Sequence, residues 1–219
     1  MLASQLIQTE YPVINFFDKA SFALHLMEDY DIQHLAVKNQ EKLAGIICKE
    51  DLLDADGQMT IAELKENLIQ RFVKGQEHFF AAVKLASEFN LSIVPVVNDA
   101  LAIIGIITGK ELLKAVSDYI GCEQPGGIIV LEIEKRNFSF GEIARLVETN
   151  DAYITQLNTA IEEGTGLILV TIKINRVEVS DIVSTFQRFD YPVRYYFGVE
   201  EYANELKENY HHLIAYLNI

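Results

Sequence analysis

Residues 45–53 read GIICKEDLL, and residues 105–113 read GIITGKELL. The glycine, the two isoleucines and the two leucines recur at an offset of sixty residues without a gap. An internal repeat of this period indicates two copies of one supersecondary unit, each with an apolar face that the other copy can cover. The stretch therefore predicts a tandem fold in the first half of the chain.

The repeat extends upstream of both stretches. The strand-like segment around Val37 aligns with PVVND around Val97, and the helix-like ASFALHLMEDYDI aligns with HFFAAVKLASEFNL. Apolar spacing and polar turns predict the order strand, helix, strand, strand, helix in each copy. Residues 54–68, which join the copies, are expected to carry a short amphipathic helix. We place the first repeat at 1–60 and the second at 61–122.

The second half of the chain begins after the linker CEQPGG at 122–127, since Pro-Gly-Gly cannot continue a helix. Periodicity and the hairpin signal EEGTG then predict strand, helix, strand, strand, helix, strand over 126–198. This is the order of the ferredoxin-like split βαβ fold. Residues 199–219 are expected to form a C-terminal helix with an apolar stripe. The fold class is therefore α+β.

Composition excludes several classes of protein. Half of the 219 residues are hydrophobic, and the formal net charge is −14. That charge disfavours binding to nucleic acid or to an anionic membrane surface. No apolar run approaches the roughly 20 residues of a membrane span. The two cysteines are too few for a disulfide framework, so we expect reduced thiols and a cytoplasmic protein.

The repeats resemble a tandem pair of cystathionine β-synthase (CBS) domains, the Bateman module. The segments LAVKNQEKLAGIICKEDLL (35–53) and VPVVNDALAIIGIITGKELL (94–113) carry the resemblance. Each has an apolar strand, a polar turn, a Gly-Ile-Ile strand and an acidic residue that opens a helix. The third unit is similar in element order to an ACT domain. The layout is also similar to that of acetoin-utilisation regulatory proteins.

The CBS resemblance implies a candidate adenine-nucleotide site at the turn after each Gly-Ile-Ile strand. A helix N-terminus offers free N–H groups and a positive dipole to phosphate, and a nearby acid can hold ribose hydroxyls. The candidates are Thr108 and Glu111 in the second repeat and Cys48 and Asp51 in the first. Cys48 is a poor phosphate donor, and Glu111 is longer than the usual aspartate. Alternatively, both acids only stabilise the first turn of their helices.

The ACT resemblance implies an effector site near the loop KRNFSFGE at 135–142. The candidate residues are Asn137, Phe138, Ser139, Phe140 and Gly141. The two phenylalanines can instead fill the space that a ligand needs, which would make the domain purely structural. Ser139 can also serve as a helix N-cap, with Glu142 three residues later completing a capping box.

No catalytic or metal-binding motif is present in the sequence. The five histidines lack the spacing of paired metal ligands, and neither a nucleophile elbow nor a phosphate loop occurs. We therefore expect no enzyme activity, no metal and no cofactor. The sequence favours a cytoplasmic, homodimeric regulatory protein that senses an adenine nucleotide or another small metabolite. The alternative is an interaction module with degenerate sites that acts through dimerisation.

Overall fold

A computed structural model describes residues 1–198. The chain forms two compact units, Met1–Val116 and Ser117–Ile219. The C-terminal helix expected at 199–219 lies outside the described residues. Within residues 1–198, no helix has both the length and the apolar character needed to cross a membrane.

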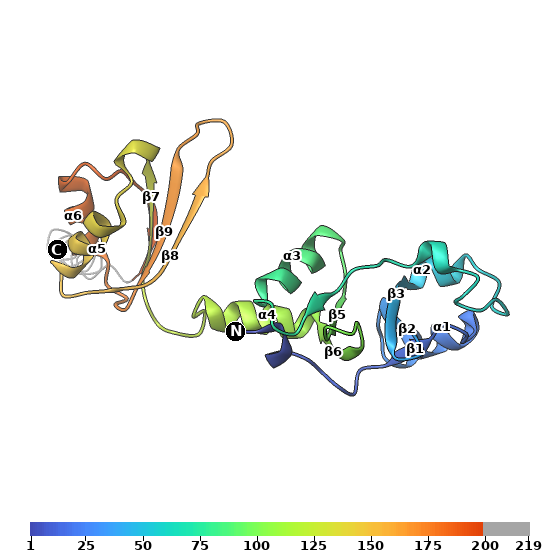
Figure 1. The fold of residues 1–219 in the computed structure, drawn as a ribbon. Helices are drawn as coiled ribbons and strands as arrows, with labels where there is room; N and C mark the ends of the chain where they lie inside the picture. Colours follow the sequence, from blue (N-terminus) through green and yellow to red (C-terminus); the bar gives the residue numbers. More distant parts are fainter. Residues whose placement is uncertain (199–219) are drawn as a thin grey trace, which may run out of the picture. The chain divides into compact units, whose positions relative to one another are not determined.

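The first repeat is a three-stranded sheet with two helices (Figure 1). Its elements are β1 (Val13–Asn15), α1 (Ala20–Asp29), β2 (His34–Asn39), β3 (Lys42–Cys48) and α2 (Lys49–Leu53). Strand β2 lies in the centre, parallel to β1 and antiparallel to β3. Buried side chains from α1, α2 and the sheet, including Met27, Leu35 and Leu52, form the core.

The second repeat has the same order and pairing. Its elements are β4 (Val73–Lys74), α3 (Phe80–Glu88), β5 (Ile93–Val97), β6 (Ile103–Thr108) and α4 (Gly109–Tyr119). In the first repeat Val37 pairs with Gly45, and in the second Val96 pairs with Gly105; a register shift follows each pair. The two predicted βαββα units are therefore confirmed, down to the irregularity beside the shared glycine.

The two repeats share a core of their own. Ala36 and Ile46 of the first repeat cluster with Leu91, Ile93 and Ile106 of the second, each 6% exposed or less. All five lie on or next to the central strands β2 and β5 and the strands β3 and β6 beside them. Burying these faces against each other supplies the cover that neither three-stranded sheet has alone.

Each repeat is completed by a segment that lies outside it in sequence. The N-terminal segment, residues 1–8, includes the 3₁₀ turn η1 (Ala3–Gln5) and lies on the second repeat (Figure 1). Its Gln8 exchanges backbone hydrogen bonds of 2.7 and 3.0 Å with Ile106. Ile69, at the end of the joining segment, does the same with Ile46 of the first repeat, at 2.9 and 3.0 Å.

The repeated glycines permit these close approaches. A Cβ at Gly105 would lie 2.7 Å from Cβ of Ile7, and one at Gly45 would lie 2.8 Å from Cβ of Leu68. Both contacts are closer than real Cβ atoms show. The glycines that mark the sequence repeat are thus the positions where a flanking segment crosses the edge strand of each sheet.

The helix expected within 54–68 was a wrong prediction. That segment forms only the 3₁₀ turn η2 (Lys65–Asn67). The backbone around Thr60 bonds instead to the first repeat: the N–H of Ala20 donates to the carbonyl of Met59, and that of Ile61 donates to the carbonyl of Asp18. Tertiary hydrogen bonds therefore replace the helical ones, as often happens where helix propensity is a weak preference.

The second unit is a four-stranded antiparallel sheet with two helices. Its elements are β7 (Ile128–Ile133), η3 (Lys135–Asn137), α5 (Phe140–Glu148), β8 (Ile154–Ile161), β9 (Ile168–Ile174), α6 (Ser180–Arg188) and β10 (Val193–Phe197). The strand order β10-β7-β9-β8 is that of the split βαβ fold. The helices supply Ile143, Leu146 and Phe186 to a core shared with the sheet.

Four helices are followed by an acidic or amide residue in the left-handed region, where glycine is the usual choice. These residues are Asp31, Asn90, Asp151 and Asp190, with φ between 50° and 60°. Gly121 holds the same conformation, at φ 61°, after α4. Asp190 also lines a cavity of the second unit.

Candidate functional site

The turn from β6 to α4 places Thr108 and Glu111 together. Thr108 is the last residue of β6, and α4 begins at Gly109. The N–H of Gly109 donates a 2.9 Å bond to the carbonyl of Ser92, which fixes the start of the helix against β5. Thr108 and Glu111 therefore lie at the N-terminus of α4, a helix of eleven residues, where the helix dipole favours negative charge.

Glu111 is held from two sides. The hydroxyl of Thr108 donates to one carboxylate oxygen of Glu111, and the N–H of Glu111 lies 3.4 Å from that hydroxyl. The side-chain amide of Gln8 donates a 2.7 Å bond to the other oxygen. The carboxylate is thus turned back toward its own helix terminus and the N-terminal segment.

Tyr11 adds a phenol to this group. Burial, together with the nearby Glu111 carboxylate, raises the pKa of Tyr11 to about 12, so the phenol stays protonated at neutral pH. A cavity of about 280 Å³ lies alongside, walled by the start of the first repeat and by β6. Gln8 and Tyr11 line it, and Lys38 contributes a cation to its wall.

The turn from β3 to α2 is the counterpart in the first repeat. The N–H of Lys49 donates a 2.9 Å bond to the carbonyl of Gln33, which repeats the bond between Gly109 and Ser92. Asp51 accepts a 2.8 Å bond from the side-chain amide of Asn67. Cys48 precedes the helix but makes no side-chain capping bond. The first-repeat turn therefore has a carboxylate, Asp51, that corresponds to Glu111, but it has Cys48 in place of the Thr108 hydroxyl.

A buried histidine connects the first turn to the second repeat. His34 is 8% exposed, and its Nδ1 lies 2.9 Å from the hydroxyl of Ser92 and 3.3 Å from the Ser92 N–H. Because the N–H donates, Nδ1 acts as the acceptor. Burial lowers the pKa of His34, while the carboxylates of Glu50 and Asp51 act in the opposite direction.

A second cavity, of about 580 Å³, lies beside Gly45. Phe16, Phe72, Lys42 and Lys65 are among the residues that line it. Sequence reasoning did not identify this cavity, because its walls come from several segments that lie far apart in the sequence, among them the turn at 39–42 and residues 65–72. No residue pattern typical of a ligand site marks these segments.

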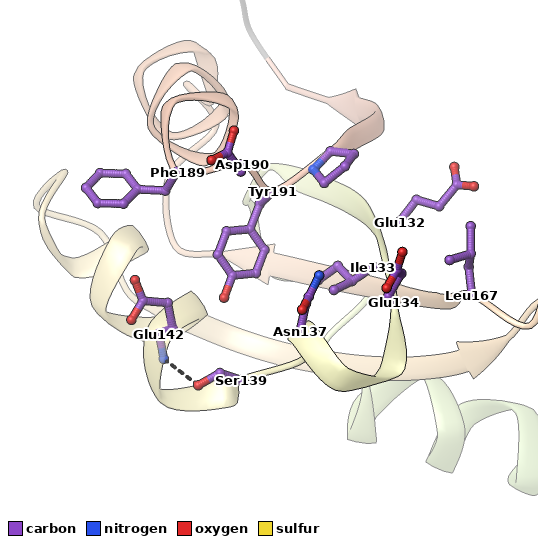
Figure 2. A pocket seen from close by; sticks show the side chains of 11 residues that line it. Glu132, Ile133, Glu134, Asn137, Ser139, Glu142, Leu167, Phe189, Asp190 and Tyr191 are labelled. Carbon is purple, nitrogen blue, oxygen red and sulfur yellow. Dashed lines mark hydrogen bonds between the residues drawn. The ribbon is translucent and has the colours of Figure 1, made fainter.

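The second unit holds the largest of the described cavities, of about 840 Å³, next to the predicted effector loop (Figure 2). Asn137 and Ser139 of that loop line it, as Figure 2 shows. The complete lining is Glu132, Ile133, Glu134, Asn137, Ser139, Glu142, Leu167, Phe189, Asp190, Tyr191 and Pro192.

The other three candidate residues of the loop lie elsewhere. Phe138 packs against the core, Phe140 is 56% exposed, and a Cβ at Gly141 would meet nothing within 4 Å. Neither phenylalanine is among the residues that line the cavity. Ser139 is the N-cap of α5: its hydroxyl accepts a 3.3 Å bond from the N–H of Glu142. The expected N-cap is therefore confirmed.

Sequence reasoning missed Asp190 and Tyr191, which wall the same cavity from the far side. They lie about fifty residues beyond the loop and reach it because α6 ends there. The order of elements in a split βαβ fold could have indicated this proximity, since β7 and β10 are neighbours in the sheet. No group of three or more His, Cys, Asp or Glu within residues 1–198 could hold a metal ion.

Comparison with protein families identifies the tandem repeats. The model of the CBS domain matches residues 3–57 and again residues 65–118. Among curated proteins, a homoserine O-acetyltransferase of Methanobrevibacter ruminantium is 28% identical over 122 residues, or 54% of this chain. The match covers 24% of that enzyme, so the chain spans about a quarter of its curated relative's length.

Two solved structures are among those to which the chain is similar. A CBS domain pair/ACT domain protein from Thermotoga maritima matches with a TM-score of 0.51 and 22% identity, over 55% of this chain and 99% of that one. A Vibrio cholerae protein named for acetoin utilization matches with a TM-score of 0.47 and 19% identity, over 56% and 95% of the two chains.

Proposed function

Since the chain belongs to the CBS-domain family through its tandem repeats, we propose that it is a non-catalytic regulatory protein that senses a small metabolite. The metabolite is an adenine nucleotide or a related adenosine compound. It binds at the turn from β6 to α4, with Glu111 toward the ribose and Thr108 toward the phosphate. No resident cofactor is needed for this role.

The observation that carries the proposal is the bonding around Glu111. A carboxylate at a helix N-terminus, bonded to a hydroxyl and to an amide, can exchange the amide for ribose hydroxyls of similar geometry. Lys38 in the adjoining cavity supports the site by offsetting part of the −14 net charge that a nucleotide meets. The N–H groups that open α4 are further donors.

The first-repeat turn is the weaker candidate. Cys48 stands where the second repeat has Thr108, and a thiol is a weaker donor than a hydroxyl. Helix α2 has only five residues, so its dipole is also smaller. We therefore assign the nucleotide to the second-repeat turn and keep Asp51 as the alternative ribose carboxylate.

We propose an ACT-type sensory role for the second unit and a homodimer for the whole protein. The βαββαβ order and the cavity beside the first strand-to-helix loop support the former. The competing function is an interaction module whose ligand sites have degenerated. The bonds that already hold Glu111 and Asp51 favour that reading, because both carboxylates are satisfied by the chain itself.

Titration calorimetry with AMP, ADP, ATP and S-adenosylmethionine tests the proposal. Loss of a hydrogen bond to a charged group costs about 1.5–3 kcal/mol, so Glu111→Gln should weaken binding roughly tenfold or more. Glu63→Gln is the matched control, because Glu63 accepts bonds of 2.7 and 2.8 Å from Thr60 at the same spacing, outside the site. Tight binding retained in both Glu111→Gln and Asp51→Ala would place the ligand elsewhere, and no binding of any nucleotide would favour the interaction module.

A further inference from the structure

The cavity of the second unit is lined by a tyrosine that is largely buried, and the hydroxyl of this tyrosine opens on the cavity and has no partner in the described chain. Tyr191 is 9% exposed, and its ring packs against Phe186 with centroids 6.0 Å apart. Within residues 1–198, no group hydrogen-bonds to the phenol oxygen. Figure 2 shows this oxygen pointing toward the side of the cavity that Asn137, Ser139 and Glu142 form.

Because the hydroxyl opens on the cavity and no group of the described chain occupies it, it is available to a bound molecule. Burial, followed by the nearby Glu142 carboxylate, raises the pKa of Tyr191 above its usual value, against a smaller effect of Arg145. The phenol therefore keeps its proton at neutral pH. It can both donate and accept a hydrogen bond.

The walls around this hydroxyl are acidic. Four carboxylates line the cavity (Glu132, Glu134, Glu142 and Asp190), and the described lining contains no lysine or arginine. Two arginines outside the lining offset part of the charge: Arg136 lies 2.6 Å from Glu134, and Arg145 lies 2.8 Å from Glu142. The four lining carboxylates outnumber these two arginines by two. The cavity therefore favours a ligand with positive charge.

We propose that this cavity binds a small organic amine that carries primary ammonium groups and no carboxylate. An ammonium group has three donors and no acceptor. Glu134, Glu142, Asn137 and the Tyr191 hydroxyl supply acceptors for it. A carboxylate on the ligand would meet four like charges and no lining cation, so zwitterionic amino acids are disfavoured. A volume of about 840 Å³ accommodates a linear amine of several carbons.

The inference rests on the proposed sensory role of the second unit, but not on the nucleotide site. Calorimetry on the full chain tests it with three probes that share a four-carbon chain and one ammonium group: 1,4-diaminobutane, 1-aminobutane and 4-aminobutanoate. We expect the diamine to bind most tightly. The aminobutanoate should bind at least about tenfold more weakly, since one ammonium is replaced by a carboxylate.

Two variants separate a binding role from a structural one. Tyr191→Phe should weaken diamine binding by roughly threefold to tenfold, the value of one hydrogen bond. It should leave the melting temperature unchanged or higher, because the hydroxyl has no partner to lose. Glu134→Gln should also weaken binding. The matched controls, outside the cavity, are Tyr153→Phe and Glu148→Gln, which should bind as the native chain does.

Three results would overturn the inference: no diamine binding, equal affinity in Tyr191→Phe, or tighter binding of the aminobutanoate. Nucleotide binding without amine binding would remove this inference and leave the proposed nucleotide site intact. Amine binding without nucleotide binding would support this inference and remove the proposed nucleotide site.

Discussion

The side-chain amide of Gln8 donates a 2.7 Å hydrogen bond to the carboxylate of Glu111, across 103 residues of sequence. The same residue, Gln8, is tied by its backbone to Ile106 on β6. The N-terminal segment therefore holds the group that we assign to the ribose. A ligand that takes the Glu111 carboxylate must displace the Gln8 amide from it.

Gln8→Ala is expected to tighten nucleotide binding while it lowers stability. The ligand no longer competes with an intramolecular bond to a charged group, worth about 1.5–3 kcal/mol, so affinity should rise by roughly tenfold or more. Calorimetry and denaturant unfolding measure the two effects. Gln5→Ala is the control, because Gln5 bonds to the Leu2 N–H at 2.7 Å and does not contact Glu111. Weaker nucleotide binding in Gln8→Ala would show that Gln8 supports the ligand instead.

Gly105→Ala is expected to destabilise the protein by about 1–3 kcal/mol, the usual cost of overpacking. The added Cβ would lie 2.7 Å from Cβ of Ile7 and 3.1 Å from the carbonyl oxygen of Gln8. Residues 1–8 must then move away from β6, and hydrogen exchange there should accelerate. Gly141→Ala is the matched control, with open space around the new Cβ. Unchanged exchange at residues 1–8 would contradict this account of the repeated glycine.

The stability of the protein should fall as the pH drops below about 6.5, the ordinary pKa of histidine. Burial lowers the pKa of folded His34, so the unfolded chain binds its proton first. The contribution of neutral His34 is therefore complete above that pH and is lost as the pH falls toward its folded pKa. Protonation also removes the acceptor that bonds to Ser92.

Denaturant unfolding between pH 5 and 8 measures this dependence. His34→Gln should show a smaller loss of free energy of unfolding on acidification than the native chain. His25→Gln, at a highly exposed position on α1, should follow the native curve. Parallel curves for the native chain and His34→Gln would exclude His34 as the cause.

Light scattering is expected to give twice the chain mass of 24.8 kDa. The second unit exposes apolar side chains at both edges of its sheet: Ile161 on β8 is 69% exposed, and Phe197 on β10 is 63% exposed. A second copy can cover such a face by a self-complementary twofold contact. Phe197→Glu should yield monomers, whereas Phe17→Glu, at a 72% exposed position of the first unit, should not. A native mass of one chain would refute the dimer.

The sequence predicted the tandem fold because the repeated residues include those that the fold requires at special positions. Gly45 and Gly105 mark the crossing of a flanking segment, and the isoleucines after them fill the cores. Local patterns are informative where the same pattern occurs twice. They failed at residues 54–68, whose helical spacing is overridden by backbone bonds to Ala20 and Asp18.

The candidate sites could be predicted only in part. Thr108 and Glu111 are three residues apart, so their proximity follows from the helix that begins between them. The partners Gln8 and Asn67 come from distant segments without a motif, and no local pattern indicates them. Likewise Asn137 and Ser139 were expected beside a cavity, but Tyr191 was not, because its position depends on where α6 ends.

The pairing of residues 1–8 with the second repeat has a consequence for biosynthesis. Residues 1–8 leave the ribosome about a hundred residues before β6, the strand with which they pair. Closing so long a loop costs more entropy than closing the local turns, so this contact forms after them. In the first repeat, by contrast, Ile69 can pair with Ile46 as soon as residue 69 emerges from the ribosome. The nascent chain therefore passes through a stage in which one repeat is complete while its N-terminal segment is still unfixed and accessible to proteases and chaperones.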